Sequence, residues 1–221
     1  MELAIVGLGK MGGNMAERLL LGGHKVVGVD PSAEAAARLK SKGGVHAPSI
    51  VAAAGMLKGP RHVWLMIPAG SPVDEAIAAV LPALSAGDTI IDGGNSNYKD
   101  SQRRGRELAA KGIHFVDCGT SGGVWGLKNG YSMMIGGPKE AVERMRPIFE
   151  TLAPGKAEGW GHVGPTGSGH FVKMVHNGIE YGMMQAFAEG FAIMHKKAEF
   201  GLDMAQIATI WQVGSVVRSW L

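Results

Sequence analysis

Short apolar segments alternate with longer segments of helical periodicity along most of the chain. The short segments are rich in β-branched residues and apolar at nearly every position, which is typical of strands buried on both faces of a parallel sheet. The alternation predicts strands at Leu3–Val6, Lys25–Val29, His62–Ile67, Thr89–Ile91, Ile113–Val116 and Tyr131–Ile135. It predicts helices at Met11–Leu21, Ala33–Leu39, Val73–Leu81, Ser101–Ala110 and Pro138–Leu152. We therefore expect an α/β fold with a doubly wound, mostly parallel sheet.

The pattern changes in the last part of the chain. The stretch Ser168–Lys196 contains no strong helix-breaking pair, is rich in methionine and phenylalanine, and is too long for a typical crossover helix. It predicts one long helix that begins an all-α domain, followed by a second helix with Asp203 as its N-cap. This division predicts domains at residues 1–167 and 168–221. Because the apolar pattern is still running at residues 218–221, we expect the all-α domain to be truncated.

The composition excludes several classes of protein. Glycine makes up 35 of the 221 residues, more than twice the average share of about 7%. With 46% hydrophobic residues the chain can nevertheless form a core, so we do not expect disorder. The net charge is only +3, and the densest basic cluster, Arg103, Arg104 and Arg106, fits the exposed side of a helix. This charge pattern gives no reason to expect nucleic acid as a partner. No apolar run is long enough to span a membrane and no targeting signal is visible, so we do not expect a membrane as a partner either.

The cysteine and the histidines give little sign of metal or disulfide chemistry. A single cysteine, Cys118, excludes an internal disulfide and suits a reducing, cytoplasmic compartment. It has no partner at metal-ligand spacing, so we interpret it as a buried, inert thiol. The histidines are scattered, and we expect His24, His62, His114 and His195 either on the surface or hydrogen-bonded in the core. We therefore expect no metal.

A glycine-rich segment directly follows the first predicted strand. Its Gly-x-Gly-x-x-Gly spacing is carried by Gly7, Gly9 and Gly12, a predicted helix follows, and Asp30 ends the next strand. Glycine allows a tight turn and brings backbone N–H groups close to a pyrophosphate at the helix N-terminus. The context predicts a Rossmann-like dinucleotide site, with an ordinary glycine-rich turn as the alternative. The loop residues predicted to bind the cofactor are Gly7, Leu8, Gly9, Lys10, Met11 and Gly12.

Asp30 also bears on the choice of cofactor. A carboxylate at this place accepts hydrogen bonds from the ribose hydroxyls of NAD and repels the 2′-phosphate of NADP. The following residues, Pro31, Ser32 and Ala33, include no arginine that would bind that phosphate. We therefore predict a preference for NAD over NADP. The alternative is that Asp30 only caps the helix that begins at Ala33.

Five polar residues share one face of the long predicted helix. They stand at i, i+3, i+4, i+7 and i+8, a spacing that apolar core residues normally occupy. These residues, called the polar stripe below, are Lys173, His176, Asn177, Glu180 and Tyr181. Because neighbours such as Met174, Val175 and Ile179 are apolar, we expect the helix to be buried around the stripe. The stripe then offers a base, an acid and hydrogen-bonding groups, whereas the alternative is a solvated, charged face.

Two further segments have the composition of ligand-binding loops. Asp92–Ser96 follows a predicted strand, and the carboxyl ends of strands are where ligands of doubly wound sheets bind. Gly119–Gly123 offers a hydroxyl and bare backbone N–H groups suited to a carboxylate. Each segment taken alone also fits a simple turn from a strand to a helix.

Taken together, these motifs resemble the decarboxylating 6-phosphogluconate dehydrogenases. The resemblance rests on Gly7–Gly12, Asp92–Ser96, Ser121–Gly123 and Lys173–Tyr181, and it extends over essentially the whole chain. The related 3-hydroxyisobutyrate dehydrogenases share the glycine loop, the Ser-Gly-Gly and a helix with lysine and asparagine. The His-Asn and Glu-Tyr pairs of the last segment distinguish the two families.

The resemblance implies a reaction and a role for each residue. NAD would oxidise 6-phospho-D-gluconate, and loss of CO2 would leave D-ribulose 5-phosphate and NADH. Lys173 would be the general base on the C3 hydroxyl, once burial or nearby positive charge has neutralised it, and Glu180 would protonate C1 of the enediol. The residues implied for the substrate, a phosphorylated sugar acid, are Asn95, Ser121, Gly122, Gly123, His176, Asn177 and, for its phosphate, Tyr181. Those implied near the cofactor, besides the glycine loop and Asp30, are Ile67, Pro68, Ala69 and Asn95.

The chain departs from the pattern of this family in three respects. Many members carry Asn-Arg where this chain has Asp30-Pro31, which agrees with the prediction of NAD. Many carry Val-Lys-Ala where this chain has Ile67-Pro68-Ala69, so a lysine near the cofactor is missing. Members also continue well beyond 221 residues and form dimers whose second subunit supplies further basic phosphate ligands. We therefore expect a homodimer or higher homo-oligomer in a full-length form and weak substrate affinity in this chain.

Two other functions stay open at this point. One is a β-hydroxyacid dehydrogenase of the 3-hydroxyisobutyrate type, which acts on a smaller, unphosphorylated acid. The other is a dinucleotide-binding module without turnover.

Overall fold

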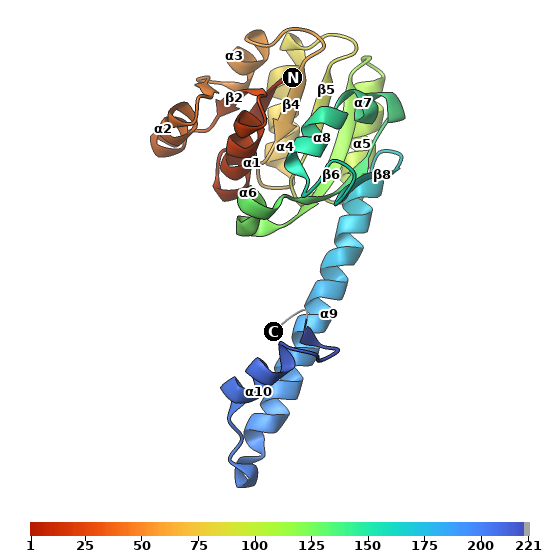
Figure 1. Ribbon diagram of the computed structural model, residues 1–221. Helices are drawn as coiled ribbons and strands as arrows, with labels where there is room; N and C mark the ends of the chain where they lie inside the picture. Colours follow the sequence, from red (N-terminus) through yellow and green to blue (C-terminus); the bar gives the residue numbers. More distant parts are fainter. Residues whose placement is uncertain (219–221) are drawn as a thin grey trace. The chain divides into compact units, whose positions relative to one another are not determined.

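The computed structural model describes residues 1–218 and separates into two compact units, Met1–Lys173 and Met174–Leu221. The first unit contains the sheet and most of the helices (Figure 1). The boundary between the units lies inside the long helix, whereas the domain boundary predicted between residues 167 and 168 lies at the start of that helix. Of residues 218–221, on which the expected truncation of the all-α domain rests, residues 219–221 lie outside the described residues.

A single sheet organises the first unit, with the strand order β3-β2-β1-β4-β5-β6-β7-β8. Neighbouring strands are parallel except for β6 and β7, which are antiparallel. The predicted doubly wound, mostly parallel sheet is therefore confirmed. The strands are β1 Glu2–Val6, β2 Lys25–Val29, β3 Val45–His46, β4 His62–Leu65, β5 Thr89–Asp92, β6 His114–Ser121, β7 Ser132–Gly136 and β8 Trp160–Gly164.

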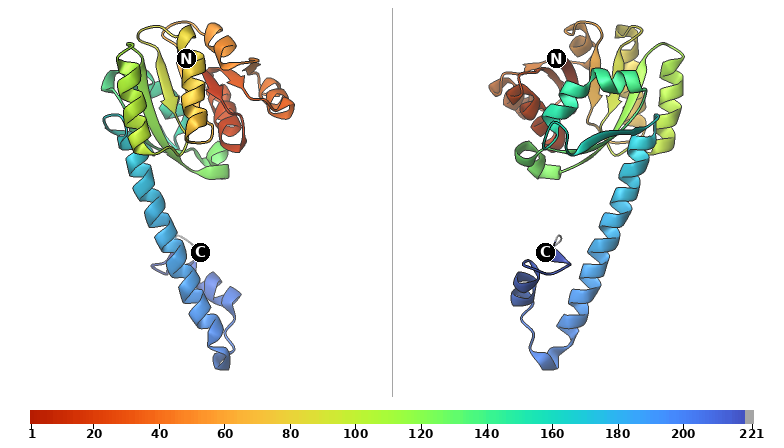
Figure 2. Two further views of the ribbon diagram at one scale, coloured as in Figure 1. Left: turned by 180° about the vertical axis from the view of Figure 1, so that it is seen from behind. Right: turned by 45° about the vertical axis from the view of Figure 1, so that its right-hand side comes forward.

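Helices cover both faces of this sheet (Figures 1 and 2). Helices α1, α2, α7 and α8 pack on one face, and α3, α4 and α5 pack on the other. The helices of the first unit are α1 Lys10–Leu21, α2 Ala33–Ser41, α3 Ile50–Gly55, α4 Ser71–Val80, α5 Tyr98–Ala109, α6 Gly126–Asn129, α7 Lys139–Arg144 and α8 Arg146–Leu152, with short 3-10 helices η1 Leu81–Ala83 and η2 Gly123–Trp125.

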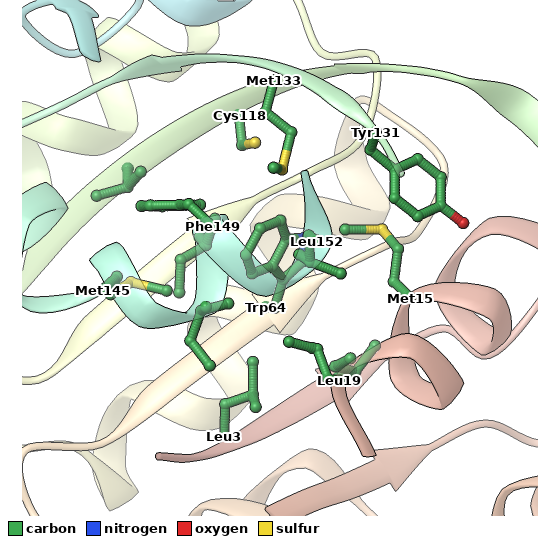
Figure 3. Close-up of a cluster of buried hydrophobic side chains, with 14 of the residues drawn as sticks. Leu3, Met15, Leu19, Trp64, Cys118, Tyr131, Met133, Met145, Phe149 and Leu152 are labelled. Carbon is green, nitrogen blue, oxygen red and sulfur yellow. The ribbon is translucent and has the colours of Figure 1, made fainter. Parts of the chain in front are cut away.

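In the central strands, successive residues enter opposite hydrophobic clusters. In β1, Leu3 lies in the cluster below α1 and α8, whereas Ala4 lies in the cluster below α3 and α4. In β4, Trp64 and Val63 divide in the same way. Figure 3 shows the first cluster, in which the rings of Trp64 and Phe149 meet edge to face with their centroids 5.9 Å apart. The continuous apolar pattern of the strands therefore reflects burial on both sides of the sheet.

Strands β3 and β8 and helices α3 and α6 of the first unit are absent from the sequence-based expectations, as are its two short 3-10 helices. Strand β3 has two residues and α3 has six, too few for a periodic pattern to stand out. Strand β8 is partly exposed and contains two glycines, so it lacks the apolar signature of the other strands. The helix predicted at Pro138–Leu152 is divided at Met145, and Pro147 lies in the first turn of α8. Proline has no N–H and cannot continue the hydrogen bonds of a preceding helix.

The second unit consists of the rest of the long helix and a second helix. Helix α9 spans Ser168–Lys196, as predicted, and is followed by η3 Ala198–Phe200 and α10 Met204–Trp211. The carboxylate of Asp203 caps α10 by accepting hydrogen bonds from the N–H groups of its first turn at 2.9 and 3.0 Å. No helix within residues 1–218 is both long and apolar enough to cross a membrane.

The apolar residues around the polar stripe are not buried, contrary to expectation. Ile179 is 59% exposed, and Met174 and Val175 are nearly half exposed. In the second unit, the aromatic contact between α9 and α10 lies further along, where Phe191 meets Trp211 at 5.6 Å. An apolar side chain favours burial, but its burial depends on a second surface that local sequence does not describe.

The arginine cluster of α5 also differs from expectation at one position. Arg103 is partly exposed and Arg106 is exposed, but Arg104 is buried, with 1% of its side chain accessible. Ser101, Arg104 and Leu108 form the buried face of α5, because residues at i, i+3 and i+7 share one side of a helix. The predicted exposure of Arg104 is therefore wrong.

His62 makes the stability of the first unit depend on pH. Its side chain is buried at the start of β4, and Nδ1 has no hydrogen-bond partner among residues 1–218, so it is not the satisfied core histidine that we expected. Burial, helped by the positive charge of Arg144, lowers the pKa of His62 from 6.5 to about 4. At a pH between these two values, the His62 imidazole is mostly protonated in the unfolded chain and mostly neutral in the folded chain. The free energy of unfolding therefore has its full value above pH 6.5. It decreases by about 3 kcal/mol in total as the pH drops toward 4.

Urea unfolding between pH 4 and pH 7 measures this loss. We expect His62→Leu to remove most of the dependence of the unfolding free energy on pH within that window. His195→Leu, at an exposed position of α9, is the matched control and should keep it. Equal slopes for the unaltered chain and His62→Leu would contradict the assignment.

Candidate functional site

The glycine loop connects β1 to α1 at the carboxyl end of a central strand. Gly7 has a φ of +91°, and a side chain there would collide with the carbonyl of Met66. A side chain on Gly12 would collide with the carbonyl of Gly7, whereas nothing lies within 4 Å of a Cβ placed on Gly9. Packing therefore requires glycine at two of these positions, and the third leaves open space above the first turn of α1.

Helix α1 begins beside this open space without a side-chain cap. Its N-cap residue is Gly9, and its first turn contains no acidic residue. The first N–H groups of a helix lack partners inside the helix, and the helix dipole adds a positive potential there. A phosphate group fits this place by charge and by the space that Gly9 leaves.

Asp30 ties the end of β2 to the glycine loop. Its Oδ2 accepts a hydrogen bond from the N–H of Leu8 at 2.6 Å, and its Oδ1 accepts one from the N–H of Ser32 at 2.8 Å. Helix α2 is capped by Ser32, whose hydroxyl accepts a hydrogen bond from the N–H of Ala35 at 3.3 Å. The alternative role of Asp30, as the cap of this helix, is therefore wrong.

Two loops lie against each other at the carboxyl ends of β4 and β5. The first contains Ile67, Pro68, Ala69 and Gly70, and the second runs from Gly93 through Asn95. The N–H of Gly93 donates to the carbonyl of Leu65 at 2.9 Å, and a side chain on Gly93 would collide with the Trp64 indole. A Cβ on Gly94 would lie 3.0 Å from the carbonyl oxygen of Ile67. The two loops thus pack backbone against backbone, with Asn95 directly after the contact.

The Ser121-Gly122-Gly123 segment ends β6 and leads through η2 into α6. Gly122 and Gly123 have φ angles of +134° and +50°, which favour glycine. A Cβ on Gly122 would lie 3.2 Å from both the carbonyl oxygen of Gly130 and the ring of Tyr131, whereas nothing lies within 4 Å of one on Gly123. The segment is a strand-to-helix turn whose Gly123 backbone is open to a ligand.

Two buried carboxylates lie side by side on neighbouring strands. Asp92 and Asp117 are paired in the register of β5 and β6 and are both inaccessible to solvent. Oδ1 of Asp117 accepts a hydrogen bond from the N–H of Gly167 at 2.6 Å, and Oδ2 accepts one from the N–H of His170 at 2.9 Å. These bonds hold the start of α9 on the sheet and place a negative charge at its positive end.

Lys173 lies on β6 because two glycines let α9 approach the strand. A side chain on Gly119 would collide with Cβ of Lys173, and one on Gly169 would lie 2.5 Å from the carbonyl oxygens of Asp117 and Met134. Lys173 is 9% exposed, so it is buried as its proposed role requires.

Asp117 and the contact between His170 and Ser101 are not among the features predicted from the sequence. One turn before Lys173, Nδ1 of His170 lies 2.7 Å from the hydroxyl of Ser101 in α5. A carboxylate inside the apolar strand around Phe115 and Val116 must find hydrogen-bond donors, and this was the signal available for Asp117. No comparable signal marks His170 and Ser101.

The remaining residues of the polar stripe belong to the second unit. Nδ1 of His176 lies 3.6 Å from Oε2 of Glu180, one helical turn away, and 3.3 Å from Oδ1 of Asn177. The side chains of His176 and Glu180 are 39% and 36% exposed. Tyr181 is 69% exposed. Because α9 is continuous, the stripe follows one face of a single helix.

The cysteine has no part in this chemistry. Cys118 is fully buried on the opposite face of β6, and burial raises the pKa of its thiol to about 12. The predicted burial of this thiol is confirmed. Within residues 1–218 no group of three or more histidine, cysteine, aspartate or glutamate side chains is arranged to hold a metal ion.

This architecture is that of a dinucleotide-binding dehydrogenase. A doubly wound parallel sheet carries a glycine loop at the N-terminus of α1 and a carboxylate after β2 that reaches back to the loop. Residues 2–164 match the family model described as the NAD binding domain of 6-phosphogluconate dehydrogenase, and residues 169–201 match that of the 6-phosphogluconate dehydrogenase C-terminal domain. The chain belongs to the 6-phosphogluconate dehydrogenase family.

Similar proteins differ in the cofactor that their names state. The chain is 43% identical over its whole length to the NAD(+)-dependent, decarboxylating 6-phosphogluconate dehydrogenase of Haloferax volcanii and spans 72% of that protein. It is 40% identical over 223 aligned positions to the NADP(+)-dependent enzyme of Bacillus subtilis, of which it spans 47%. The solved structure of 6-phosphogluconate dehydrogenase from Plasmodium falciparum superimposes with a TM-score of 0.87 at 33% identity, covering 97% of this chain and 48% of that one.

Because α9 lies so close to β6, we expect one added methyl group at their contact to lower the stability of the first unit. Gly119→Ala places a Cβ against Lys173 and the carbonyl of Gly169, so α9 must move. We expect a loss of about 1–3 kcal/mol in the free energy of unfolding, measured by urea denaturation. The control is Gly55→Ala, at the end of α3, where a Cβ has no neighbour within 4 Å and stability should stay the same or rise. Unchanged stability in Gly119→Ala would contradict this account of the packing.

Proposed function

We propose that this chain carries the cofactor site and the reacting helix for NAD-dependent oxidative decarboxylation of 6-phospho-D-gluconate. The products are D-ribulose 5-phosphate, CO2 and NADH. The observation that carries the proposal is the burial of Lys173 against β6, on the continuous helix that also bears Glu180. The family to which the chain belongs supports this substrate.

The glycine loop and Asp30 are the residues proposed to hold NAD. The open space at Gly9 and the uncapped start of α1 suit a pyrophosphate. Each carboxylate oxygen of Asp30 accepts one backbone N–H and keeps a lone pair for a ribose hydroxyl. The backbone of 67–69 and Asn95 complete the proposed site. When bound, NAD supplies the acceptor for the hydride that leaves C3 of the substrate.

Lys173 is proposed to take the proton of the C3 hydroxyl as the hydride leaves. The amine must be neutral for this step, and its buried position leaves little water to compete with the hydroxyl. The product of this step is a 3-keto acid, whose carbonyl accepts the electrons of the C1–C2 bond as CO2 departs. Lys173 can then return its proton to the oxygen of the enediol.

Glu180 is proposed to complete the reaction by protonating C1 of the enediol while Lys173, neutral again, takes the proton of the C2 hydroxyl, which becomes the ketone. His176, one helical turn before it at 3.6 Å, lies where it can orient the carboxyl group. We propose that Asn95, Ser121, Gly122, Gly123, His176 and Asn177 bind the sugar acid and that Tyr181 binds its phosphate. A homodimer and a cytoplasmic location stay predictions from sequence.

The proposed cofactor preference can be measured by binding alone. We expect titration calorimetry to show NAD binding at least about tenfold more tightly than NADP, because the Asp30 carboxylate repels a 2′-phosphate. Asp30→Ser should reduce this difference by weakening NAD binding and removing the repulsion. Ser32→Ala, which removes only the cap of α2, is the control and should keep the ratio. Tighter binding of NADP by the unaltered chain would refute the preference.

The roles of Lys173 and Glu180 predict variants that bind the cofactor but do not react. We expect Lys173→Met and Glu180→Gln each to lower the rate of NADH formation from 6-phosphogluconate by about 10²–10⁴-fold. NAD affinity should stay within about twofold of the unaltered chain, because neither group is proposed to touch the cofactor. Lys196→Met, at an exposed position of the same helix, is the control and should react normally.

Parallel assays separate the competing functions. We expect the chain to oxidise 6-phosphogluconate and not 3-hydroxyisobutyrate. The reverse result would assign the chain to the 3-hydroxyisobutyrate type of dehydrogenase. NAD binding without NADH formation from either acid would mean a dinucleotide-binding module and would overturn the proposed reaction. Near-normal turnover in Lys173→Met would overturn the role of the base.

A further inference from the structure

Arg104 is a buried charge that the proposed chemistry does not use. Its side chain is 1% exposed, on the face of α5 that packs against the sheet. Removing a guanidinium from water is costly unless hydrogen bonds and opposite charges replace the water. The hydrogen-bond partners of the guanidinium therefore show which segments of the chain Arg104 connects.

The partners of Arg104 come from two loops at the carboxyl edge of the sheet. Nε and Nη2 donate to the two carboxylate oxygens of Asp74, in the first turn of α4, at 2.8 and 3.1 Å. Nη2 also donates to the carbonyl of Gly70 at 3.0 Å. Nη1 lies 3.5 Å from Oδ2 of Asp92, the last residue of β5. Oδ1 of the same carboxylate accepts a hydrogen bond from the N–H of Gly94 at 3.1 Å.

These contacts link the two loops that follow β4 and β5. Gly70, with a φ of +92°, closes the loop that contains Ile67, Pro68 and Ala69. Asp92 opens the loop that leads to Asn95. The loops already pack backbone against backbone, so a change in the position of either one moves the other.

We infer that Arg104 is a positioning residue that sets the relation between the loop at 67–70 and the loop at 92–95. The inference rests on the proposed function in one respect, because these loops are proposed to hold NAD and the sugar acid. Arginine suits this place because its planar fork can engage a carboxylate through two hydrogen bonds while a third donor reaches another partner. A lysine would keep the charge but could not make all three contacts in the same geometry.

The contact with Arg104 also changes the acidity of Asp74. The Arg104 guanidinium, with a smaller contribution from Arg103, lowers the pKa of the Asp74 carboxyl from 3.8 to about 2. Arg103 donates to the same carboxylate at 2.9 Å but is 41% exposed, and the structure gives it no bond to Gly70 or Asp92. Arg103 is therefore a matched control: the same residue type, on the same helix, with one shared partner.

Amide hydrogen exchange tests the inference without any ligand. In Arg104→Lys we expect exchange to accelerate by about tenfold in peptides covering 66–74 and 92–97, because charge-assisted bonds that hold both segments are lost. Peptides covering β1 and β2 should exchange as before. Arg103→Lys should change neither loop by more than about twofold. In NMR titrations, Arg104→Lys should raise the pKa of Asp74 toward its ordinary value, whereas Arg103→Lys should raise it less.

A second variant keeps the test informative if Arg104→Lys does not fold. Asp74→Asn removes the charge at the end of the contact on α4 and keeps a side-chain oxygen as an acceptor for Arg104, so that the guanidinium does not lose every bond to this side chain. We expect faster exchange at 66–74 with little change at 92–97. Unchanged exchange in both loops, or a uniform increase across the first unit, would overturn the inference. So would equal effects of Arg103→Lys and Arg104→Lys.

Cofactor binding then connects the loops to function. We expect Arg104→Lys to bind NAD about tenfold more weakly than the unaltered chain, and Arg103→Lys to bind it normally. Normal NAD affinity in an Arg104→Lys variant with loosened loops would refute the positioning role. Failure of the unaltered chain to bind NAD would instead overturn the proposed function, and the exchange results would still decide whether Arg104 holds the loops.

Discussion

Two carboxylates on neighbouring strands impose the constraint on which the site depends. Asp92 and Asp117 face each other in the register of β5 and β6, both inaccessible to solvent, on strands that lie about 4.8 Å apart. Like charges on neighbouring buried side chains repel where water is absent. Each therefore needs its own donors. Asp92 receives them from Gly94 and from Arg104 of α5, and Asp117 receives two backbone N–H groups from the start of α9. Satisfying these charges docks both helices on the sheet.

The position of the reacting lysine follows from that docking. Because Asp117 holds the first turn of α9, and because Gly119 and Gly169 present no side chains, the helix meets β6 at backbone distance. Lys173 then reaches a buried place one turn further along. On the opposite face of β5 and β6 the side chains are apolar groups such as Ile91 and Val116, together with the buried thiol of Cys118. The two carboxylates share their face of the sheet with apolar side chains such as Ile90 and Phe115, because alternate residues of a strand point to the same side.

Besides the turns in which a positive φ favours glycine, two physical causes account for glycine in this chain. At Gly12, Gly93 and Gly119 a side chain would collide with backbone or with a neighbouring side chain, so glycine serves the packing. At Gly9 and Gly123 a Cβ would meet nothing within 4 Å, so the missing side chain leaves room in the loops where phosphate and carboxylate groups are proposed to bind. Composition shows only the excess, whereas the neighbours of each glycine distinguish these causes.

Sequence alone determined the features that depend on local periodicity and spacing. The apolar strands, the bounds of α9, the cap at Asp203 and the place of the glycine loop follow from short-range patterns. Tertiary structure decided the rest, because it depends on partners distant in the chain. Arg104 is buried since Asp74 comes to it from 30 positions away, and Asp117 is satisfied by N–H groups 50 and 53 positions away. Ile179 stays exposed because an apolar residue is buried only where a second surface covers it.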